Sequence, residues 1–363
     1  MADHADPRRL SLRRRLALEA WRQKQKINVK NHQLRQLFWE STHRCNVNCL
    51  HCGSDCTANT GVKDMPAEDF LRVVDSIRPH VDPHHTMIII SGGEPLVRRD
   101  LEEVGRELYR REFTWGIVTN ALALTPERFE ALRQAGLRSV GISLDGLRDD
   151  HDWLRNHPGS FDRAIAAARM LAAQEDVVFD VITCVNSRNI STLPQLRDLL
   201  VEAGVPSWRL FTIFPSGRAA DNPELPLSHE QYRSLMRFIA DTRRQGAIHA
   251  EYCCEGFLGE WEGEVRDEFY RCEAGVSVAS VLIDGSISGC ASIRSSYTQG
   301  NIYKDDFMEV WNHRFGQYRD RSWARQGECG DCSLWRYCEG NGMHLRRDDG
   351  SLARCNLNDL SQR

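Results

Sequence analysis

The sequence has no long apolar run and no strong excess of charge of either sign. No segment comes near 18 consecutive apolar residues, and the N-terminus has no hydrophobic signal core, so neither a membrane span nor secretion is supported and a cytoplasmic location is expected. The formal net charge is -4, with 27% charged and 41% hydrophobic residues, which argues against general nucleic-acid binding. A chain of 363 residues with this composition is expected to be a globular protein of two domains.

Cysteine, in contrast, is abundant. The chain has 13 cysteines, several of them clustered at short spacings. A reducing cytosol keeps thiols free, so structural disulfides are not expected in such a protein. The clustering therefore indicates that many of these cysteines bind metal.

The N-terminal arm, residues 1–35, is basic, whereas the rest of the chain is acidic. Residues 1–36 carry an excess of Lys and Arg that gives a local charge of about +7. The segment SLRRRLALEAWRQKQK predicts a helix with Ser11 as its N-cap and with Leu12, Leu16 and Ala20 along one face. Two interpretations are open: a solvated helix packed across the body or a frayed terminus, and a docking site for an acidic partner or a leader peptide.

Residues 36–250 alternate short apolar runs with amphipathic helical patterns. Each run is rich enough in β-branched or aromatic residues for a buried strand, and Pro66, Gly136 and Gly204 punctuate the helices between them. Strands separated by helices imply right-handed βαβ units and a parallel sheet, in which the chemistry lies at the carboxyl ends of the strands. We therefore expect an α/β fold, either a partial (β/α)6 TIM-like barrel or a doubly wound sheet. The six predicted strands span residues 36–42, 86–91, 114–120, 139–145, 177–185 and 207–214.

The stretch STHRCNVNCLHCGSDC, residues 41–56, directly follows the first predicted strand and has the pattern C-x3-C-x2-C-x3-C. Two kinds of site fit this pattern. In one, all four thiolates close a zinc site or an iron-sulfur cluster. In the other, Cys45, Cys49 and Cys52 hold three irons and leave a fourth position open, with Cys56 as a bystander. The polar motifs SGGEP, TN, SLDG and FPSGRA end other strands, and they favour the open site because a closed one would leave them without a role.

These motifs resemble those of the radical S-adenosylmethionine superfamily, with His51 where that family usually has an aromatic residue. The resemblance implies a [4Fe-4S] cluster on Cys45, Cys49 and Cys52, whose open iron binds the amino and carboxylate groups of S-adenosylmethionine. It also implies reductive cleavage of that cofactor to a 5′-deoxyadenosyl radical, which abstracts hydrogen from a substrate. The residues that the resemblance assigns to the cofactor are Gly92, Gly93, Glu94, Asn120, Ser143 and Arg155, the last being suited to a carboxylate.

Cysteine-rich sequence returns in the C-terminal third of the chain. The spacing C-x2-C-x5-C over residues 329–338, followed by Cys355, fits a zinc ribbon when taken alone. The longer order, in which Cys272, Gly285 and Cys290 precede that set, resembles the SPASM extension of radical enzymes that modify peptides, and this implies two auxiliary iron-sulfur clusters. The expected domains are the basic arm (1–35), a radical S-adenosylmethionine core (36–250) and a small cysteine-rich SPASM-type domain (251–363).

One position departs from the pattern of that extension. The family places a further cysteine at position 342, where this chain has Gly342. The first auxiliary cluster, on Cys272 and Cys290, therefore lacks one usual ligand. Either Cys253 or Cys254 supplies a third ligand, or this cluster is degraded or absent. The second auxiliary cluster keeps four ligands, Cys329, Cys332, Cys338 and Cys355.

The resemblance also narrows the substrate. Sulfatase-maturing relatives carry an acidic residue directly after the cysteine that matches Cys290. This chain has Ala291 there, so sulfatase maturation is less well supported. A barrel that begins near residue 36 is also expected to leave no room for the N-terminal winged-helix domain with which some relatives recognise peptides. We expect oxidation or cross-linking of a ribosomally made peptide or protein, with or without a leader segment. An auxiliary cluster would accept an electron, and a flavodoxin or ferredoxin would be the electron donor. The alternatives are a haem or tetrapyrrole precursor as substrate, and a non-enzymatic iron-sulfur electron carrier.

Four further residues have open interpretations. Asp145 and Asp152 are either acid-base groups or groups that orient the cofactor and a helix. Cys184 is expected to be a buried thiol in the fifth strand. Arg218, at the end of the sixth strand, either contacts adenosine or substrate or forms a structural salt bridge.

Overall fold

A single sheet organises the chain. The computed structural model describes residues 6–213, 215–253, 255–293 and 296–361, and within them a 10-stranded sheet has the order β10-β9-β8-β1-β2-β3-β4-β5-β6-β7. The pairs from β8 through β1 to β7 are parallel, and β9 and β10 are added antiparallel at one end. The strands are β1 (Gln36–Glu40), β2 (Met87–Ser91), β3 (Thr114–Thr119), β4 (Leu137–Ser143), β5 (Val178–Val185), β6 (Ser207–Thr212), β7 (His249–Tyr252), β8 (Val278–Val281), β9 (Ser286–Ser288) and β10 (Gly300–Asn301).

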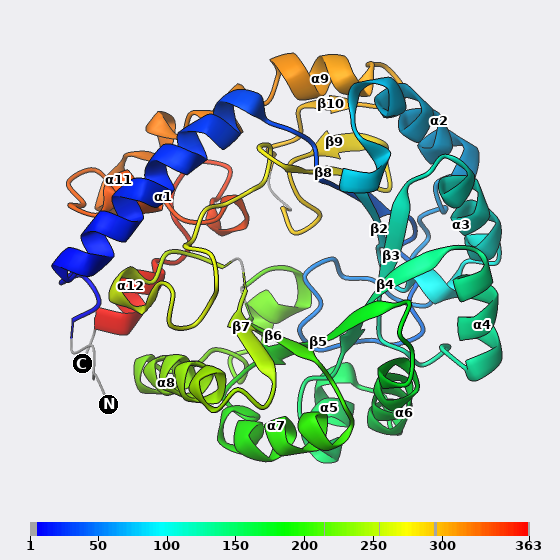
Figure 1. The fold of residues 1–363 in the computed structure, drawn as a ribbon, viewed down its shortest axis with the longest axis horizontal. Helices are drawn as coiled ribbons and strands as arrows, with labels where there is room; N and C mark the ends of the chain where they lie inside the picture. Colours follow the sequence, from blue (N-terminus) through cyan, green and yellow to red (C-terminus); the bar gives the residue numbers. More distant parts are fainter. Residues whose placement is uncertain (1–5, 214, 254, 294–295, 362–363) are drawn as a thin grey trace.

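The parallel part of the sheet is curved, and helices surround its outer side (Figure 1). Strands β1 to β6, with the helices between them, confirm the predicted α/β fold and its six βα units, and β7 adds a further parallel strand that the sequence analysis did not predict. The helices are α1 (Leu12–Asn31), α2 (Ala67–Ile77), α3 (Leu101–Arg110), α4 (Pro126–Gln134), α5 (Arg148–Arg155), α6 (Ser160–Ala172), α7 (Leu193–Glu202), α8 (His229–Gln245), α9 (Phe307–His313), α10 (Gly316–Arg319), α11 (Trp335–Cys338) and α12 (Asn356–Ser361).

Local sequence explains where several of these helices begin and end. Ser228 and Gln231 form a reciprocal capping box at the start of α8, and Gly246 ends the helix with φ of 72°. Such a left-handed residue at a helix end strongly favours glycine. The two glycines predicted to stop helices, Gly136 and Gly204, have φ of 94° and 77°, so these stop signals are confirmed.

The C-terminal region continues the sheet of the barrel. Strand β8 pairs in parallel with β1, with Gln36 opposite Val278 and Trp39 opposite Val281. Beyond β8, the backbone N–H of Ile283 donates a 3.1 Å hydrogen bond to Glu40 Oε2 at the end of β1. Because parallel neighbours end at the same edge, the segment that follows β8 leaves the sheet beside the loop that follows β1.

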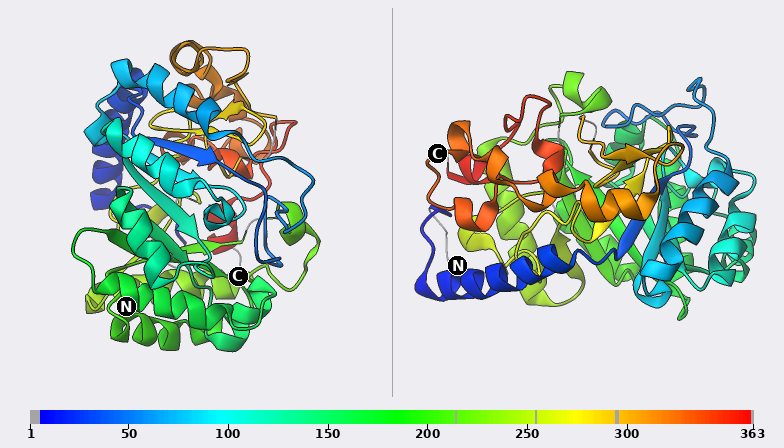
Figure 2. Two further views of the ribbon diagram at one scale, coloured as in Figure 1. Left: turned by 90° about the vertical axis from the view of Figure 1, so that its right-hand side faces the viewer. Right: turned by 90° about the horizontal axis from the view of Figure 1, so that it is seen from above.

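Helix α1 confirms the predicted N-cap, and the leucines predicted to share one face lie on its exposed side. Ser11 accepts a hydrogen bond from the backbone N–H of Arg14, but the side chains of Leu12 and Leu16 are 74% and 64% exposed, whereas Leu18 and Gln25 are buried. The reason is tertiary: α1 lies along the C-terminal region (Figures 1 and 2), where it contacts α11. The described part of the arm thus contains a packed helix, as in the first of the two interpretations.

The core lies between the sheet and its helices. Trp39, Trp115 and Trp208, one on each of three strands, are fully buried, and Trp39 stacks on Phe70 of α2 with ring centroids 4.6 Å apart. Burial of such aromatic surface is a large favourable contribution to folding.

None of the helices in the described ranges offers the long apolar stretch that spanning a bilayer requires.

Candidate functional site

The cysteine loop lies at the carboxyl end of β1, packed against the end of β2. The backbone N–H groups of Gly93 and Glu94 donate to the carbonyl oxygens of Thr42 (2.7 Å) and Arg44 (2.9 Å), and the N–H of Cys45 donates to Thr57 (3.0 Å). A Cβ on Gly93 would overlap the Arg44 carbonyl oxygen. The glycines that were assigned to the cofactor therefore also allow the loop to approach the sheet.

Cys45, Cys49, Cys52 and Cys56 all lie in one cluster of packed side chains, together with Val47 and Leu122. Two nitrogen donors approach their sulfur atoms: Asn120 Nδ2 lies 3.8 Å from Cys45 Sγ, and Arg155 Nη1 lies 3.6 Å from Cys49 Sγ. Donors aimed at sulfur fit thiolates that hold an iron-sulfur cluster. Burial raises the pKa of the Cys45 thiol to about 12, so this thiol is protonated at neutral pH unless a metal ion takes the place of the proton.

Cys56 is buried beside Cys52. A hydrogen bond from Cys56 lowers the pKa of Cys52, and the Cys56 thiol also lies 3.7 Å from the Ser54 carbonyl oxygen. The structure thus brings the fourth cysteine of the motif next to a predicted cluster ligand. That Cys56 is a bystander and not a ligand stays a prediction.

Glu94 is buried at the end of β2, and other parts of the protein occupy both of its carboxylate oxygens. Oε1 accepts hydrogen bonds from Thr119 Oγ1 (2.7 Å) and the N–H of Leu96 (3.0 Å), and Oε2 accepts one from the N–H of Asn120 (2.8 Å). The Asn120 side chain in turn reaches Cys45 and Asn46. Glu94 and Asn120 therefore support the cysteine loop, whatever contact they also make with a cofactor.

Arg155, the last residue of α5, forms a buried ion pair with Asp145, which lies two residues beyond Ser143 at the carboxyl end of β4. Arg155 Nε lies 2.6 Å from Asp145 Oδ2. Burial alone would raise the pKa of Asp145, but the neighbouring Arg155 holds that pKa below its usual value. An ionised carboxylate that is paired in this way is a weak proton acceptor, so the orienting interpretation of Asp145 is favoured over the acid-base one. Asp152 likewise orients local structure, because its carboxylate accepts from the N–H groups of Gly159 and Phe161.

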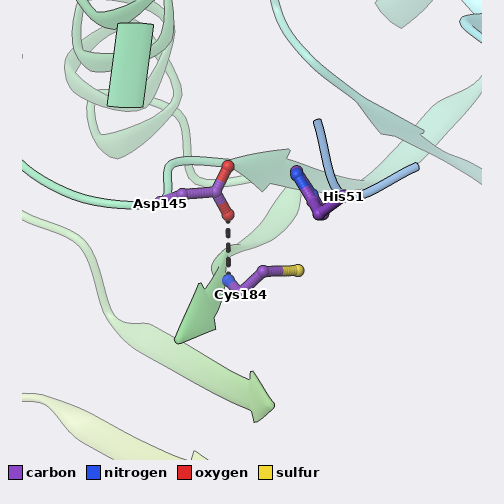
Figure 3. Close-up of side chains that lie close together, drawn as sticks. All are labelled: His51, Asp145 and Cys184. Carbon is purple, nitrogen blue, oxygen red and sulfur yellow. Dashed lines mark hydrogen bonds between the residues drawn. The ribbon is translucent and has the colours of Figure 1, made fainter. Parts of the chain in front are cut away.

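His51 and Cys184 lie beside Asp145, the carboxylate of this ion pair (Figure 3). Their ligand atoms all lie within 4.8 Å of one another, and the N–H of Cys184 donates a 2.9 Å hydrogen bond to Asp145 Oδ1. Burial lowers the pKa of His51 to about 4, so its imidazole is neutral. Sequence reasoning treated these residues separately. The sequence pattern that could have grouped them is their position: each lies at, or just after, the carboxyl end of a strand of the same parallel sheet.

Arg218 holds the cysteine loop. Its guanidinium donates to the carbonyl oxygens of Cys49 (2.8 Å) and Cys56 (3.0 Å) and pairs with Asp55 at 2.7 Å, and its N–H donates to the carbonyl oxygen of Cys52. The arginine after β6 thereby joins the backbone at Cys49, Cys52 and Cys56 of the cysteine loop. These contacts support the structural interpretation of Arg218.

The Arg218→Ala variant is expected to lose about 1.5–3 kcal/mol of unfolding free energy, because charged hydrogen bonds to two loop carbonyls disappear. Its iron content after anaerobic reconstitution should also fall, because a less ordered cysteine loop holds its thiols less well in place. Denaturant unfolding and iron analysis measure the two effects. The exposed Arg169→Ala variant, which removes only a surface pair with Glu202, is the control. Wild-type iron content and stability in Arg218→Ala would show that the arginine does not hold the loop.

The predicted ligands of the second auxiliary cluster lie together. All four of these cysteines line one cavity, whose wall also includes Trp335, Gly340 and Asn341. Arg346 Nη2 lies 3.4 Å from the sulfur of one of them. Four thiols around one cavity with a cationic donor fit an iron-sulfur cluster, and they are Cys329, Cys332, Cys338 and Cys355.

The first auxiliary set is less complete. Burial, and then the neighbouring thiols of Cys272 and Cys290, raise the pKa of Tyr318, so these two thiols lie near the same hydroxyl group. At Gly342 the His344 imidazole fills the place of a side chain, since a Cβ there would lie 2.6 Å from His344 Cε1. Cys254 lies outside the described residues, and a third thiolate from Cys253 or Cys254 stays a prediction.

Comparison with known proteins agrees with this arrangement. A model of the radical SAM superfamily matches residues 39–200, and a model of the SPASM iron-sulfur cluster-binding domain matches residues 272–333. An AdoMet-dependent heme synthase of Methanosarcina barkeri is 28% identical over 324 residues, which are 84% of this chain and 90% of the relative. The mycofactocin maturase MftC of Mycobacterium tuberculosis is 28% identical over 313 residues, 85% of this chain and 78% of the relative.

Among solved structures, the AdoMet-bound anSMEcpe has a TM-score of 0.69 at 20% sequence identity, and the match covers 90% of this chain and 94% of that one. Streptococcus suis SuiB bound to S-adenosylmethionine has a TM-score of 0.68 at 18% identity, covering 88% of this chain and 76% of that one. At these identities the likeness shows the fold alone.

Proposed function

We propose that this chain, which carries a radical SAM domain followed by a SPASM domain, cleaves S-adenosylmethionine reductively and abstracts hydrogen from an organic substrate. The observation that carries the proposal is the cluster of Cys45, Cys49 and Cys52 at the carboxyl edge of the sheet, with Asn120 and Arg155 aimed at two of the sulfur atoms. Three thiolates leave one iron of a [4Fe-4S] cluster free for the cofactor, which supplies a 5′-deoxyadenosyl radical after one-electron reduction.

The residues around the cysteine loop bind and orient. Arg155 is placed between Asp145 and the Cys49 sulfur, so one guanidinium holds the β4 end and the loop in a fixed relation. Ser143 ends β4 at the same edge. Gly92 and Gly93, at the end of β2, admit the loop, so the end of β2 lies against the backbone that leads to Cys45. The cofactor contacts of these residues remain proposals.

Two substrate classes have support, and the comparisons change their order. A haem or tetrapyrrole precursor is favoured because the chain matches AdoMet-dependent heme synthases over 84% of its length and over 82–90% of theirs. A ribosomally made peptide or protein, which the sequence analysis placed first, is favoured by the equal identity to a mycofactocin maturase and by the SPASM domain. We propose the tetrapyrrole precursor first and the peptide second. In both, a flavodoxin or ferredoxin would supply the electron.

A substrate assay under anaerobic conditions tests this proposal. The reconstituted, reduced protein is given S-adenosylmethionine with Fe-coproporphyrin III, the tetrapyrrole for which one relative is named, or with synthetic peptides encoded by short reading frames beside the gene. Mass spectrometry of both substrates and quantification of 5′-deoxyadenosine are the readouts. A mass change in the porphyrin that depends on Cys45, Cys49 and Cys52 supports the first class, and a change confined to a peptide supports the second. Absence of 5′-deoxyadenosine from a fully iron-loaded protein would favour the electron-carrier alternative.

The Arg155→Ala variant is expected to bind S-adenosylmethionine at least about tenfold more weakly, which is about 1.4 kcal/mol, when the affinity is expressed per iron-loaded protein. Calorimetric titration of the reconstituted protein measures the affinity. The single substitution leaves the Asp145 carboxylate buried without its partner, so the Arg155→Ala/Asp145→Asn double variant is the matched control. Unchanged affinity in both variants would remove Arg155 from the cofactor site.

A further inference from the structure

Arg346 is a buried arginine that reaches the cavity of the C-terminal cysteines. Its side chain is 3% exposed. Nε and Nη2 donate to the Gly340 carbonyl oxygen (3.0 and 2.7 Å), Nη1 donates to that of Gly350 (3.0 Å), and Nη2 lies 3.4 Å from Cys329 Sγ. A Cβ on Gly340 would overlap Nη2, and Gly340 itself has φ of 84°. The local chain is therefore shaped to admit a guanidinium at this point.

The charge of this guanidinium has no carboxylate partner in the described part of the chain. Arg346 forms none of the ion pairs found there, and its oxygen partners are neutral carbonyl groups. By contrast, Arg155, which lies next to Cys49 in the loop after β1, is paired with Asp145. A buried charge without a counter-charge is strongly unfavourable. We therefore expect an anion other than an Asp or Glu carboxylate next to the Arg346 guanidinium.

The cysteine cavity can supply that anion. Four thiolates around a [4Fe-4S] centre carry a net negative charge in the oxidised state, and one-electron reduction adds a further negative charge. Positive charge and hydrogen bonds at the sulfur atoms stabilise the more negative state, and thus raise the reduction potential of such a centre. We infer that Arg346 is a positioning residue that tunes the auxiliary cluster on Cys329, Cys332, Cys338 and Cys355 toward accepting an electron. This inference rests on the cluster assignment made above and goes beyond it.

A structural role alone must be separated from this electrostatic role, because the three carbonyl hydrogen bonds of Arg346 also anchor the loop from Gly340 to Gly350. The Arg346→Gln variant removes the charge, and Arg346→Lys keeps the charge but loses the planar fork. Arg347→Gln removes the same charge at the next residue, where the side chain is exposed to water and its field is screened. Comparing Arg346→Gln with Arg346→Lys isolates the effect of the charge, and comparing Arg346→Gln with Arg347→Gln isolates the effect of its burial.

The experiment is a reduction-potential titration followed by electron paramagnetic resonance, performed on the full chain in a Cys45/Cys49/Cys52→Ala background that carries only auxiliary clusters. The signal of interest is the one lost in an added Cys332→Ala substitution. For Arg346→Gln we expect the reduction equilibrium to fall at least about tenfold, a shift of about 59 mV to more negative potential for a one-electron couple. For Arg346→Lys we expect less than half of that shift, and for Arg347→Gln no shift within error.

Two results would overturn the inference in different ways. An unchanged potential in Arg346→Gln, with the signal and iron content retained, would show that the arginine only anchors the loop. The same holds if Arg346→Lys shifts as far as Arg346→Gln, and Arg346→Lys decides the question if the glutamine variant does not fold. If Cys332→Ala retains all the iron and every signal, the four cysteines hold no cluster, and the cluster assignment fails together with the role of Arg346.

Discussion

Replacing Cys49 with alanine is expected to abolish the formation of 5′-deoxyadenosine from S-adenosylmethionine. Cys49 is buried between Cys45, Cys52 and the guanidinium of Arg155, and two thiolates cannot hold the three irons that leave one coordination site open. Anaerobic reconstitution, reduction and chromatographic quantification of 5′-deoxyadenosine measure the effect. Product should fall below detection, and iron per chain should decrease by about four, the content of one cluster.

The Cys56→Ala variant is the informative comparison for this experiment. Cys56 lies in the same loop and contacts Cys52, so the substitution perturbs the same region without removing a predicted ligand. It is expected to leave 5′-deoxyadenosine formation and iron content near the wild-type level. If Cys56→Ala lost activity and iron as Cys49→Ala does, four thiolates would close the site, and the three-ligand interpretation would be wrong.

The second large effect is expected at the other end of the molecule. The Cys338→Ala variant should lose about four irons per chain and all substrate turnover, while 5′-deoxyadenosine still forms slowly in the absence of substrate. The reason is geometric: Cys338 lines the cavity that holds Cys329, Cys332 and Cys355, whereas the Cys45 loop follows β1. Loss of this predicted cluster should thus remove the proposed electron acceptor and leave cofactor cleavage in place.

Iron, acid-labile sulfide and zinc per chain, measured beside 5′-deoxyadenosine, decide this prediction. Arg169→Ala is the control for metal content, because Arg169 is an exposed side chain of α6 that pairs with Glu202. Loss of zinc in place of iron from Cys338→Ala would identify a zinc ribbon. Wild-type iron content in the same variant would show that these four cysteines hold no cluster.

The sequence by itself determined the elements whose signals are local. The apolar runs of β1 to β6, the glycine stops at Gly136 and Gly204, and the Ser11 N-cap all appear in the structure where they were predicted. Cysteine spacing likewise grouped the predicted ligands of the loop after β1 and of the C-terminal cavity, and the structure places the members of each group together. These features depend on residues a few positions apart, whose mutual geometry the backbone of a turn or strand end largely sets.

Only the tertiary structure decided contacts between distant segments. Helix α1 buries Leu18 and Gln25 and exposes Leu12 and Leu16 because the C-terminal region lies against that side. β8 was not expected to pair with β1, since strand pairing depends on how the chain returns to the sheet. The same applies to side chains that the sequence left with several interpretations: Arg218 binds the cysteine loop, Arg155 pairs with Asp145, and Arg346 reaches Cys329. Residue type fixes what these arginines can bind, and packing of remote segments fixes which partner they meet.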